Sequence, residues 1–303
     1  MELRQLRHFP EIVRDSSFGQ ASDKLNITQP ALSKSISNLE HSLGCQLLER
    51  HPTGVTPTEY GMVSLDYAAL VTSELDRAVE ELNALRGKGR GVVRVGAGAT
   101  MMRYVLPQAV RRFMEQAEGN SVSFRQGLKD DLLAALRRGE IDIMVGSTSP
   151  DALPEDMRHE LILQDRIVVV ADARHPLAQR RQLSLTEIAA EAWVLPEATE
   201  PEGERLTRTL RRAGLEPPGV AVRTGSSVFM AALLKDSRYL SYLPAALIAL
   251  DPDYAHLVPL DLATPVWAPV TVGVTYRRRD VMLAPVRRFI NRLKDVAAEV
   301  PAG

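Results

Sequence analysis

Residues 16–44 read SSFGQASDKLNITQPALSKSISNLEHSLG, and this stretch decides the fold of the N-terminal part of the chain. Ser17 is placed to cap a first helix, which ends at a turn near Asn26. Thr28 is placed to cap a second helix that has Pro30 in its first turn, where no backbone donor is lost. Two helices joined by a tight turn form a helix-turn-helix.

The second helix has one apolar and one polar face. Its apolar positions are Leu32, Ile36, Leu39 and Leu43. Its polar positions are Gln29, Ser33, Lys34, Ser37 and Asn38. Such polar groups read base edges and phosphates in a DNA major groove, although a merely solvated helix face shows the same pattern. Residues 1–60 contain 6 Lys and Arg against 7 Asp and Glu, so DNA binding would depend on local cations such as Arg4, Lys34 and Arg50.

A long helix with a hydrophobic seam is predicted next, over residues 59–86, which contain no proline and only Gly61. The seam residues are Ala68, Val71, Leu75, Ala78, Leu82 and Leu85. This seam either packs on the chain's own N-terminal domain or pairs with the same helix of a second subunit. A helix of this length between two domains favours pairing. The run GKGRG at residues 87–91 then ends the helix and marks a domain boundary.

Beyond Gly91, short β-rich runs alternate with amphipathic helices, which is typical of an α/β domain with a mainly parallel sheet. The predicted strands are residues 92–96, 121–126, 141–146, 167–171, 193–195, 220–224, 239–242 and 270–276. Four of the predicted helices lie near residues 184–191, 204–213, 228–235 and 285–298. About 210 residues are more than one sheet needs, so we expect two α/β subdomains with a cleft between them.

The composition of the chain narrows the range of functions that the protein could have. The 303 residues carry 37 Lys and Arg against 38 Asp and Glu, and the single Cys45 cannot form an intrachain disulfide or a multi-thiolate zinc site. Cys45 is interpreted as a packed or half-exposed thiol. The N-terminus lacks an apolar signal core and no run approaches the ~20 apolar residues that span a bilayer, so a cytoplasmic chain without a membrane segment is predicted.

Catalytic signatures are missing from the sequence. The six histidines are scattered, and there is no H-E-x-x-H, G-x-S-x-G or G-K-[ST] motif. We therefore predict no enzymatic activity, no catalytic residues, no metal site and no cofactor. The Gly96-x-Gly98 pair fails as a dinucleotide fingerprint, because Met101 stands at the third glycine position.

Several motifs of the chain resemble the LysR-type transcriptional regulators. They are Leu6-Arg7-His8-Phe9, Ser16-Ser17-Phe18 with Ala21 and Leu25, Thr28-Gln29-Pro30-Ala31-Leu32-Ser33, Leu39-Glu40, Leu43-Gly44, Leu47-Leu48-Glu49-Arg50 and Thr56-Pro57-Thr58-Glu59-Tyr60-Gly61. The order and spacing match over some 55 residues, with three departures. Pro10 would kink or shift the first helix, Ser22 replaces a small apolar residue, and Leu48 stands where a Phe is usual.

The resemblance implies an α+β multidomain protein. Residues 1–58 would form a winged helix-turn-helix DNA-binding domain, residues 59–87 a dimerising linker helix, and residues 88–303 an effector-binding domain similar to periplasmic binding proteins. In that domain, subdomain I would cover about residues 91–162 and 268–303, and subdomain II about residues 163–267.

The resemblance also implies site residues. The DNA contacts would be Gln29, Pro30, Ser33, Lys34 and Ser37 on the recognition helix, with Arg50 and Thr53 on the wing. The effector contacts would be Thr100, Met101, Leu128, Ser147, Thr148, Ser226 and Ser227, on loops that face each other across the cleft.

The loops at residues 97–100 and 225–227 precede predicted helices, whose N-termini favour an anion such as a carboxylate. For Ser226 a plain helix N-cap is an equal reading. Arg103 either pairs with an anionic effector or is solvated. Leu128 and Met101 indicate a partly apolar ligand.

The sequence therefore predicts a ligand-responsive transcription factor. Its partners would be double-stranded DNA with an imperfect inverted repeat, a small-molecule effector that is expected to be anionic, the transcription machinery, and further copies of the chain in a homodimer and homotetramer. Two alternatives belong to other classes. One is a solute-binding module that has kept a helical domain, and the other is an adaptor that uses the seam helix for assembly.

Overall fold

The computed structural model describes residues 1–86, 91–116, 119–148, 153–196, 201–278 and 282–300. The chain folds into two compact units. Unit 1 comprises residues 1–94, 119–123 and 130–142, and unit 2 comprises the rest of the described chain.

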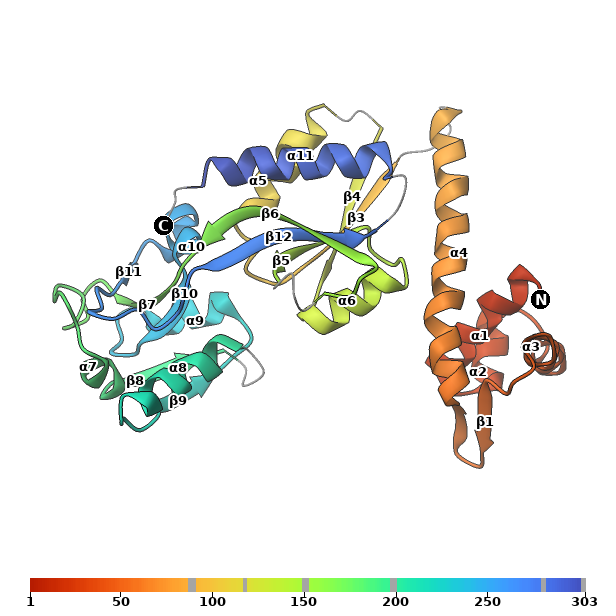
Figure 1. Ribbon diagram of the computed structural model, residues 1–303, viewed down its shortest axis with the longest axis horizontal. Helices are drawn as coiled ribbons and strands as arrows, with labels where there is room; N and C mark the ends of the chain where they lie inside the picture. The colour runs from red at the N-terminus through yellow and green to blue at the C-terminus, as the bar shows by residue number, and fades with distance from the viewer. Residues whose placement is uncertain (87–90, 117–118, 149–152, 197–200, 279–281, 301–303) are drawn as a thin grey trace. The chain divides into compact units, whose positions relative to one another are not determined.

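The start of unit 1 is a helix-turn-helix with a β-hairpin, the wing (Figure 1). Its elements are α1 (Leu3–Asp15), α2 (Phe18–Leu25), α3 (Gln29–Leu43), β1 (Leu48–His51) and β2 (Gly54–Pro57). The two strands pair antiparallel. One apolar core holds these elements together, and its buried residues are Phe9, Ile12, Phe18, Ala21, Leu32, Ile36, Leu39, Leu47, Leu48, Val55 and Ala68. The predicted winged helix-turn-helix is confirmed.

The predicted helix caps are present. The Ser17 hydroxyl oxygen accepts a hydrogen bond from the backbone N–H of Gln20 at 3.3 Å. The Thr28 hydroxyl oxygen accepts one from the backbone N–H of Ala31 at 3.4 Å. Between the two helices Asn26 adopts the left-handed conformation with φ 53°. These local interactions set the angle of the turn, because each satisfies a backbone group that the helix leaves unpaired.

Pro10 lies inside α1, which runs without interruption from Leu3 to Asp15. The helix continues because Phe9 and Ile12, on either side of Pro10, are fully buried in the core. Leu43 does not share the buried face of α3 but is 42% exposed, because it is the last residue of the helix before Gly44.

The long helix α4 (Glu59–Leu85) begins on the wing domain. The Thr58 hydroxyl oxygen accepts a hydrogen bond from the backbone N–H of Gly61 at 3.0 Å and donates its proton to the carbonyl of Gln46 at 2.7 Å. A Cβ at Gly61 would lie 2.1 Å from the carbonyl oxygen of Leu47, so only glycine allows this approach. These hydrogen bonds and this close approach hold the start of α4 against the wing domain.

The predicted seam on α4 divides into two parts. Ala68 is buried in the core of the wing domain, so it does not belong to a pairing surface. Val71, Leu75, Ala78 and Leu82 are exposed. The exposed apolar stripe also includes Tyr60, Val63, Tyr67 and Val79. The Leu85 side chain and residues 87–90 of the predicted hinge lie outside the described residues.

The other side of α4 packs on the segment that follows α6 (Lys129–Arg137). Arg77 forms a buried ion pair with Asp142, with 2.9 Å between nitrogen and oxygen. The carbonyl of Gly139 accepts hydrogen bonds from the Ser73 hydroxyl at 2.7 Å and the Arg77 guanidinium at 2.6 Å. Gly139 has φ +71°, and a Cβ there would lie 2.9 Å from the Ser73 hydroxyl oxygen. We call this arrangement of Ser73, Arg77, Gly139 and Asp142 the α4 clamp.

A five-stranded sheet follows, with strand order β4-β3-β5-β12-β6. Its strands are β3 (Val92–Ala97), β4 (Ser121–Gln126), β5 (Ile143–Ser147), β6 (Met157–Asp165) and β12 (Val270–Arg277). β3 and β5 are parallel, but β12 runs antiparallel to both β5 and β6. β3, β5 and β6 therefore share one direction, and β12, through which the chain returns, is the strand that opposes its neighbours in this sheet.

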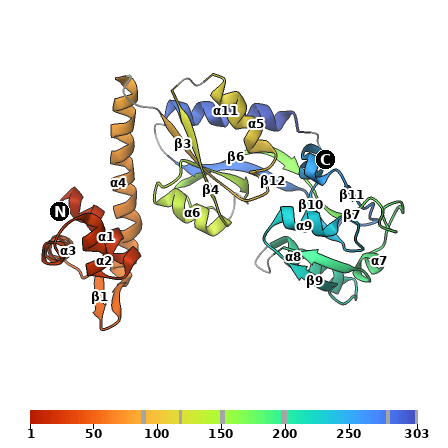
Figure 2. The same cartoon turned by 180° about the vertical axis from the view of Figure 1, so that it is seen from behind.

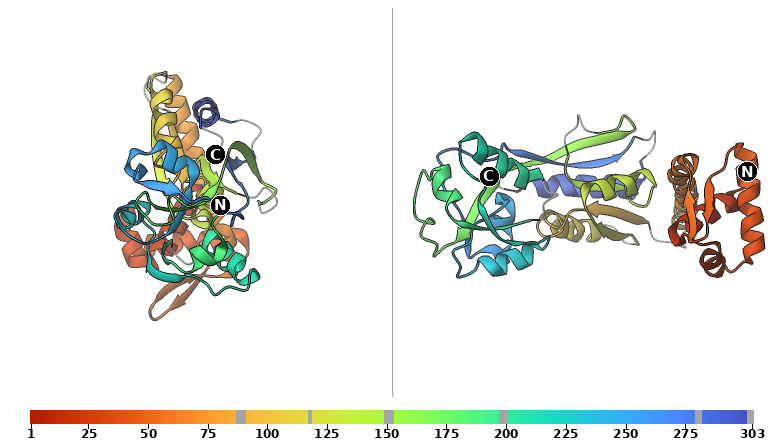
Figure 3. Two further views of the ribbon diagram at one scale, coloured as in Figure 1. Left: turned by 90° about the vertical axis from the view of Figure 1, so that its left-hand side faces the viewer. Right: turned by 90° about the horizontal axis from the view of Figure 1, so that it is seen from below.

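Two helices lie side by side along this sheet, α5 (Val105–Met114) and α11 (Ala284–Ala298), as Figures 1 and 2 show. Phe113 and Phe289 pack edge to face, with ring centroids 5.4 Å apart. β6 and β12 run together as long strands toward the second part of unit 2 (Figures 1 and 3). The chain leaves the sheet after Asp165 and re-enters it at Val270.

The second part of unit 2 has a core around Trp193, whose indole N–H donates to the carbonyl of Ile188 at 2.9 Å. β7 (Ile167–Asp172) lies between β10 (Ser241–Pro244) and β11 (Leu257–Pro259) and is antiparallel to both. β8 (Ala192–Leu195) and β9 (Gly219–Arg223) are parallel. The helices are α7 (Leu185–Ala189), α8 (Pro201–Arg212), α9 (Ser227–Leu234), α10 (Ala245–Leu250) and the 3₁₀ helix η2 (Pro252–Tyr254).

The α4 clamp generates a stability prediction. Asp142→Asn removes the nearer and buried counter-charge of the Arg77 guanidinium, which is 5% exposed, and leaves the more distant Glu74 at 3.7 Å; we expect it to lower the free energy of unfolding by about 3 kcal/mol. Urea denaturation of the full chain measures this. Replacing both partners, as Arg77→Met with Asp142→Leu, should recover most of the loss, since no buried charge then remains.

The matched control is Asp76→Asn, also on α4, where the ion pair with Arg7 is 60% and 49% exposed. It should change the free energy of unfolding by less than about 0.5 kcal/mol. Equal effects of Asp142→Asn and Asp76→Asn would contradict a structural role for the clamp.

Candidate functional site

The outward face of α3 carries the predicted DNA contacts. Gln29, Pro30, Lys34 and Ser37 are exposed on α3, and Ser33 is half-buried beside them. On the opposite face Leu32, Ile36 and Leu39 are buried in the core. The polar side chains therefore stand on a helix whose orientation is fixed by packing rather than on a mobile loop.

Arg50 on β1 joins this surface from the wing. Its guanidinium donates a hydrogen bond to the Ser33 hydroxyl at 2.8 Å and lies 4.4 Å from the centroid of the Phe18 ring. Stacking and the hydrogen bond hold the cation against α3 with its remaining donors free to meet a phosphate. Thr53, in the turn between β1 and β2, is exposed. The structure thus brings Ser33 and Arg50 into direct contact, which sequence reasoning did not foresee.

A cavity of about 500 Å³ lies in unit 2 at the carboxyl ends of several strands. Loops after β3, β4, β5, β8 and β9 contribute to its wall, as do the crossover from β6 to β7 and the starts of α8 and α9. This is where open α/β sheets place their ligands. Its polar lining residues are Thr100, Gln126, Ser147, Asp165, Glu202, Thr224, Ser227 and Tyr242.

Most of the predicted effector contacts lie on this cavity. The predicted residues in its lining are Thr100, Met101, Leu128, Ser147 and Ser227. Thr148 and Ser226 are not part of the lining. Thr148 is buried, at 2% exposure. Ser226 caps α9 through its hydroxyl oxygen, which accepts a hydrogen bond from the backbone N–H of Phe229 at 3.2 Å, so the N-cap reading is the one that the geometry supports.

The loop after β3 differs from the prediction. A helix was expected to follow Thr100 directly, but α5 begins only at Val105. Two backbone amides in the intervening turns are bonded within the loop, as Arg103 N–H donates to the carbonyl of Thr100 at 3.0 Å and Met102 N–H to that of Gly98 at 3.4 Å. The expected helix N-terminus is therefore not aimed into the cavity from this loop.

Arg103 is neither solvated nor positioned for an effector, which corrects both readings. Its guanidinium donates to Asp251 and to Asp253, each at 2.6 Å, and lies 5.3 Å from the centroid of the Tyr254 ring. It therefore ties the loop before α5 to the segment that follows α10. Burial acts to raise the pKa of Asp251, but hydrogen bonds from Arg103 and from the Asp253 backbone outweigh it and lower that pKa.

Asp165 sits at the crossover and was missed by sequence reasoning. It is 3% exposed, and one carboxylate oxygen accepts backbone N–H donors from Arg166 at 2.7 Å and Ala246 at 3.2 Å. The other oxygen accepts the Tyr104 hydroxyl at 3.2 Å. Burial, followed by the nearby Asp165 carboxylate, raises the pKa of Tyr104, so the phenol stays protonated and donates.

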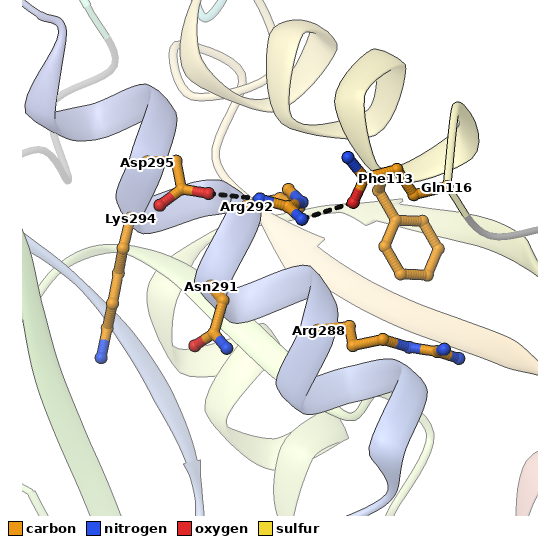
Figure 4. Close-up of a pocket in the computed structure, with 7 residues that line it drawn as sticks. All are labelled: Phe113, Gln116, Arg288, Asn291, Arg292, Lys294 and Asp295. Carbon is orange, nitrogen blue, oxygen red and sulfur yellow. Dashed lines mark hydrogen bonds and ion pairs between the residues drawn. The ribbon is translucent and has the colours of Figure 1, made fainter.

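A smaller cavity of about 410 Å³ lies between α5 and α11 (Figure 4). Its cations are largely paired within the unit. Arg292 bonds to Asp295 at 2.7 Å and to Gln116, and Lys294 pairs with Glu160. This cavity therefore leaves fewer polar groups available to a ligand than the cavity at the strand ends.

Within the described ranges, no group of three or more His, Cys, Asp or Glu side chains could hold a metal ion. Among the helices that the structure describes, none is long and apolar enough to cross a membrane.

Two protein-family models match this chain. A model of the bacterial regulatory helix-turn-helix proteins of the lysR family matches residues 3–62. A model of the LysR substrate binding domain matches residues 86–298, more than half of the chain. The chain belongs to the LysR family. As a LysR-family protein it is a transcriptional regulator with a DNA-binding domain and an effector-binding domain.

Relatives of this LysR-family chain align over most of its length. The transcriptional regulator PcaQ of Agrobacterium fabrum is 26% identical over 300 residues, which are 99% of this chain and 96% of that protein. TdcA of Escherichia coli is 28% identical over 236 residues, 78% of this chain and 75% of that protein. The crystal structure of the LysR-family regulator CbnR matches 98% of this chain and 99% of its own, with a TM-score of 0.68 and 20% identity, a likeness of fold.

The Arg103 bridge generates a prediction for this LysR-family chain. A double-mutant cycle with Arg103→Met and Asp251→Asn should give a coupling of about 1–2 kcal/mol at pH 7, because both groups are largely buried. Urea denaturation measures the cycle. Since the pKa of Asp251 is lowered by folding, its contribution is complete above the ordinary value of 3.8 and is lost as the pH falls below it.

The control cycle pairs Arg103→Met with Asp253→Asn, because Asp253 is 71% exposed. Its coupling should stay below about 0.5 kcal/mol. A coupling to Asp251 that does not decline between pH 7 and pH 3 would show that charge does not hold the bridge.

Proposed function

We propose that this chain binds a double-stranded operator through the polar face of α3 and the wing, and that a small molecule in the unit 2 cavity modulates this binding. The observation that carries the proposal is the exposed surface formed by Gln29, Ser33, Lys34 and Arg50, held in place by a buried core. Ser and Gln side chains reach base edges, while Lys and Arg meet phosphates. A structure of full-length CbnR is a complex with its target DNA, which supports this use of the fold.

The assembly we propose is a homodimer through the exposed stripe on α4. Tyr67, Val71 and Leu75 are 67%, 47% and 42% exposed, and such a stripe on a 27-residue helix is costly to leave in water. Two copies would place two recognition helices on half-sites about 34–36 Å apart or a multiple of that, so we expect an imperfect inverted repeat. A homotetramer of such dimers and contact with the transcription machinery complete the proposal.

We do not propose a catalytic role. The chemistry of the site is binding: the cavity lining offers hydroxyl, amide and carboxylate groups without a histidine among its described residues. We propose that the protein acts in the cytoplasm, where its DNA partner lies.

The test of DNA binding begins by selecting fragments of the source genome with purified protein at ~150 mM salt, where non-specific binding is weak. Sequencing should show a few enriched fragments that share an inverted repeat. Uniform or absent recovery with a folded protein would contradict operator binding.

On the selected operator, Ser33→Ala should weaken specific binding by about 1–3 kcal/mol, because it removes a group that faces the bases and releases Arg50. Fluorescence anisotropy measures the affinity, and thermal denaturation should show an unchanged midpoint. Ser42→Ala, at the far end of α3, is the control and should bind like the wild type. A midpoint that falls in proportion to affinity would mean that Ser33 is structural.

Leu75→Asp should dissociate the proposed dimer, since it places a charge in the centre of the exposed stripe. Light scattering of the purified protein should show the mass of one chain, whereas Asp76→Asn, on the neighbouring position, should keep the mass of the assembly. An unchanged mass for Leu75→Asp would exclude pairing through this stripe.

A further inference from the structure

The cavity of unit 2 has an acidic lining. Its charged residues are Asp165 and Glu202, and the described lining contains no Lys, Arg or His. Two stretches next to lining residues along the chain, 149–152 and 197–200, lie outside the described residues, and their sequences, SPDA and EATE, contain no basic residue either. The counter-charge that an anionic effector would need is therefore missing from the lining and from these adjacent stretches.

None of the cations that stand within two residues of the lining along the chain is itself a lining residue; they are Arg103, Arg125, Lys129, Arg166 and Arg223. Arg103 follows Thr100 and Met101 but is bonded to Asp251 and Asp253. Arg223 precedes the lining residue Thr224, yet it lies along a different hollow and donates to the carbonyl of Pro196 at 3.4 Å.

The two lining carboxylates have no cationic partner within the described chain. Asp165 accepts hydrogen bonds from two backbone amides and the Tyr104 hydroxyl, all of them neutral donors. Glu202 is in the first turn of α8, where its backbone carbonyl accepts the indole N–H of Trp267 at 3.0 Å, and its carboxylate forms no ion pair with a described residue. Both carboxylates therefore present to a ligand in the cavity a negative charge that no described cation offsets.

The protein itself takes part of the predicted anion sites. In the loop after β3 the amides of Met102 and Arg103 are bonded within the loop, and Ser226 takes the Phe229 amide at the start of α9. An anion in this cavity would meet two carboxylates and only neutral donors from the lining side chains, and like charges at close range disfavour binding.

We propose that the effector is a cation, an amine or guanidinium attached to an apolar body, with its charge met by Asp165 and Glu202. This inference rests on the proposed function, because it names the ligand class of that same cavity, and it replaces the expectation of an anionic effector. The apolar body matches the lining side chains Met101, Leu128, Ile167, Met230, Leu243, Val270 and Val272. A volume of about 500 Å³ suits a small molecule of this kind.

The test compares probes of similar shape and different charge. Full-length protein is titrated by calorimetry at pH 7 with 2-phenylethylamine, 2-phenylethanol and 3-phenylpropanoate. The amine should bind at least about tenfold more tightly than the carboxylate, with the alcohol between them, because a charge-assisted hydrogen bond exceeds a neutral one.

Three variants locate the effect. Glu202→Gln should weaken the amine by about fivefold and leave the alcohol unchanged, and Glu202→Lys should reverse the order of amine and carboxylate. Glu204→Gln is the matched control, since Glu204 is on the same helix but along the other hollow. Gly98→Leu should block all three probes, because Gly98 is in the lining and a Cβ there would meet no atom within 4 Å.

The outcomes separate the ligand class from the proposed function. If the carboxylate binds most tightly and Gly98→Leu blocks it, the cationic class is overturned while the cavity stands as the effector site. Amine binding that survives Gly98→Leu or is indifferent to Glu202→Gln also overturns the proposal, because the amine then binds elsewhere. If none of the probes binds at 10 mM, the class is rejected, and operator selection still decides the regulatory function by itself.

Discussion

The buried carboxylate of Asp165 is the constraint on which unit 2 depends. Asp165 is the last residue of β6, directly before β7. Its carboxylate accepts hydrogen bonds from three segments: the loop before α5, the crossover itself and the start of α10. A buried charge is stable only if its lone pairs are satisfied, so these segments cannot separate without exposing it. The wall of the cavity is therefore fixed at the point where the two sheets meet, and the same group gives the cavity its negative charge.

Unit 1 differs, because the surfaces that we propose to be functional are exposed and their orientation depends on the packing behind them. The polar face of α3 is ordered by the core beneath it, and Arg50 is ordered by Phe18 and Ser33. On α4 the side toward the wing domain carries Ala68, and the clamp side carries Arg77. What remains outward on α4 is an apolar stripe, which is the surface left over once the chain has satisfied its own contacts. This is the surface through which we propose that two copies of the chain pair.

Local chemistry was predictable from the sequence, and long-range chemistry was not. The caps Ser17 and Thr28 act on amides three residues away, so spacing alone reveals them. The partner of Arg103 is 148 residues distant in the chain, and no periodicity indicates it. Strand β6 was missed because its sequence MRHELILQD mixes charges with apolar residues and lacks regular alternation. Five of the seven residues expected to contact an effector lie in the cavity lining, whereas Glu202 and Asp165 carried no signal, because an acidic residue at a helix start or a strand end is ordinary in sequence.

One strand connects the cavity to the clamp on α4. β5 ends at Ser147, which is in the cavity lining, and it begins at Ile143, the residue after Asp142. A strand of this length spans only about 16 Å and does not stretch, because its backbone is already extended. Any displacement of Ser147 along the strand therefore reaches Asp142 unless β5 slips in register against β3 and β12, which would turn its buried side chains to the wrong face. Arg77 cannot separate from the Asp142 carboxylate without a large cost in free energy, because both charges are buried. When Asp142 moves, α4 therefore moves with it. For a ligand in the proposed effector site, this inextensible strand and the buried ion pair at its start offer a direct route to α4, at the 1–3 kcal/mol that is typical of allosteric coupling.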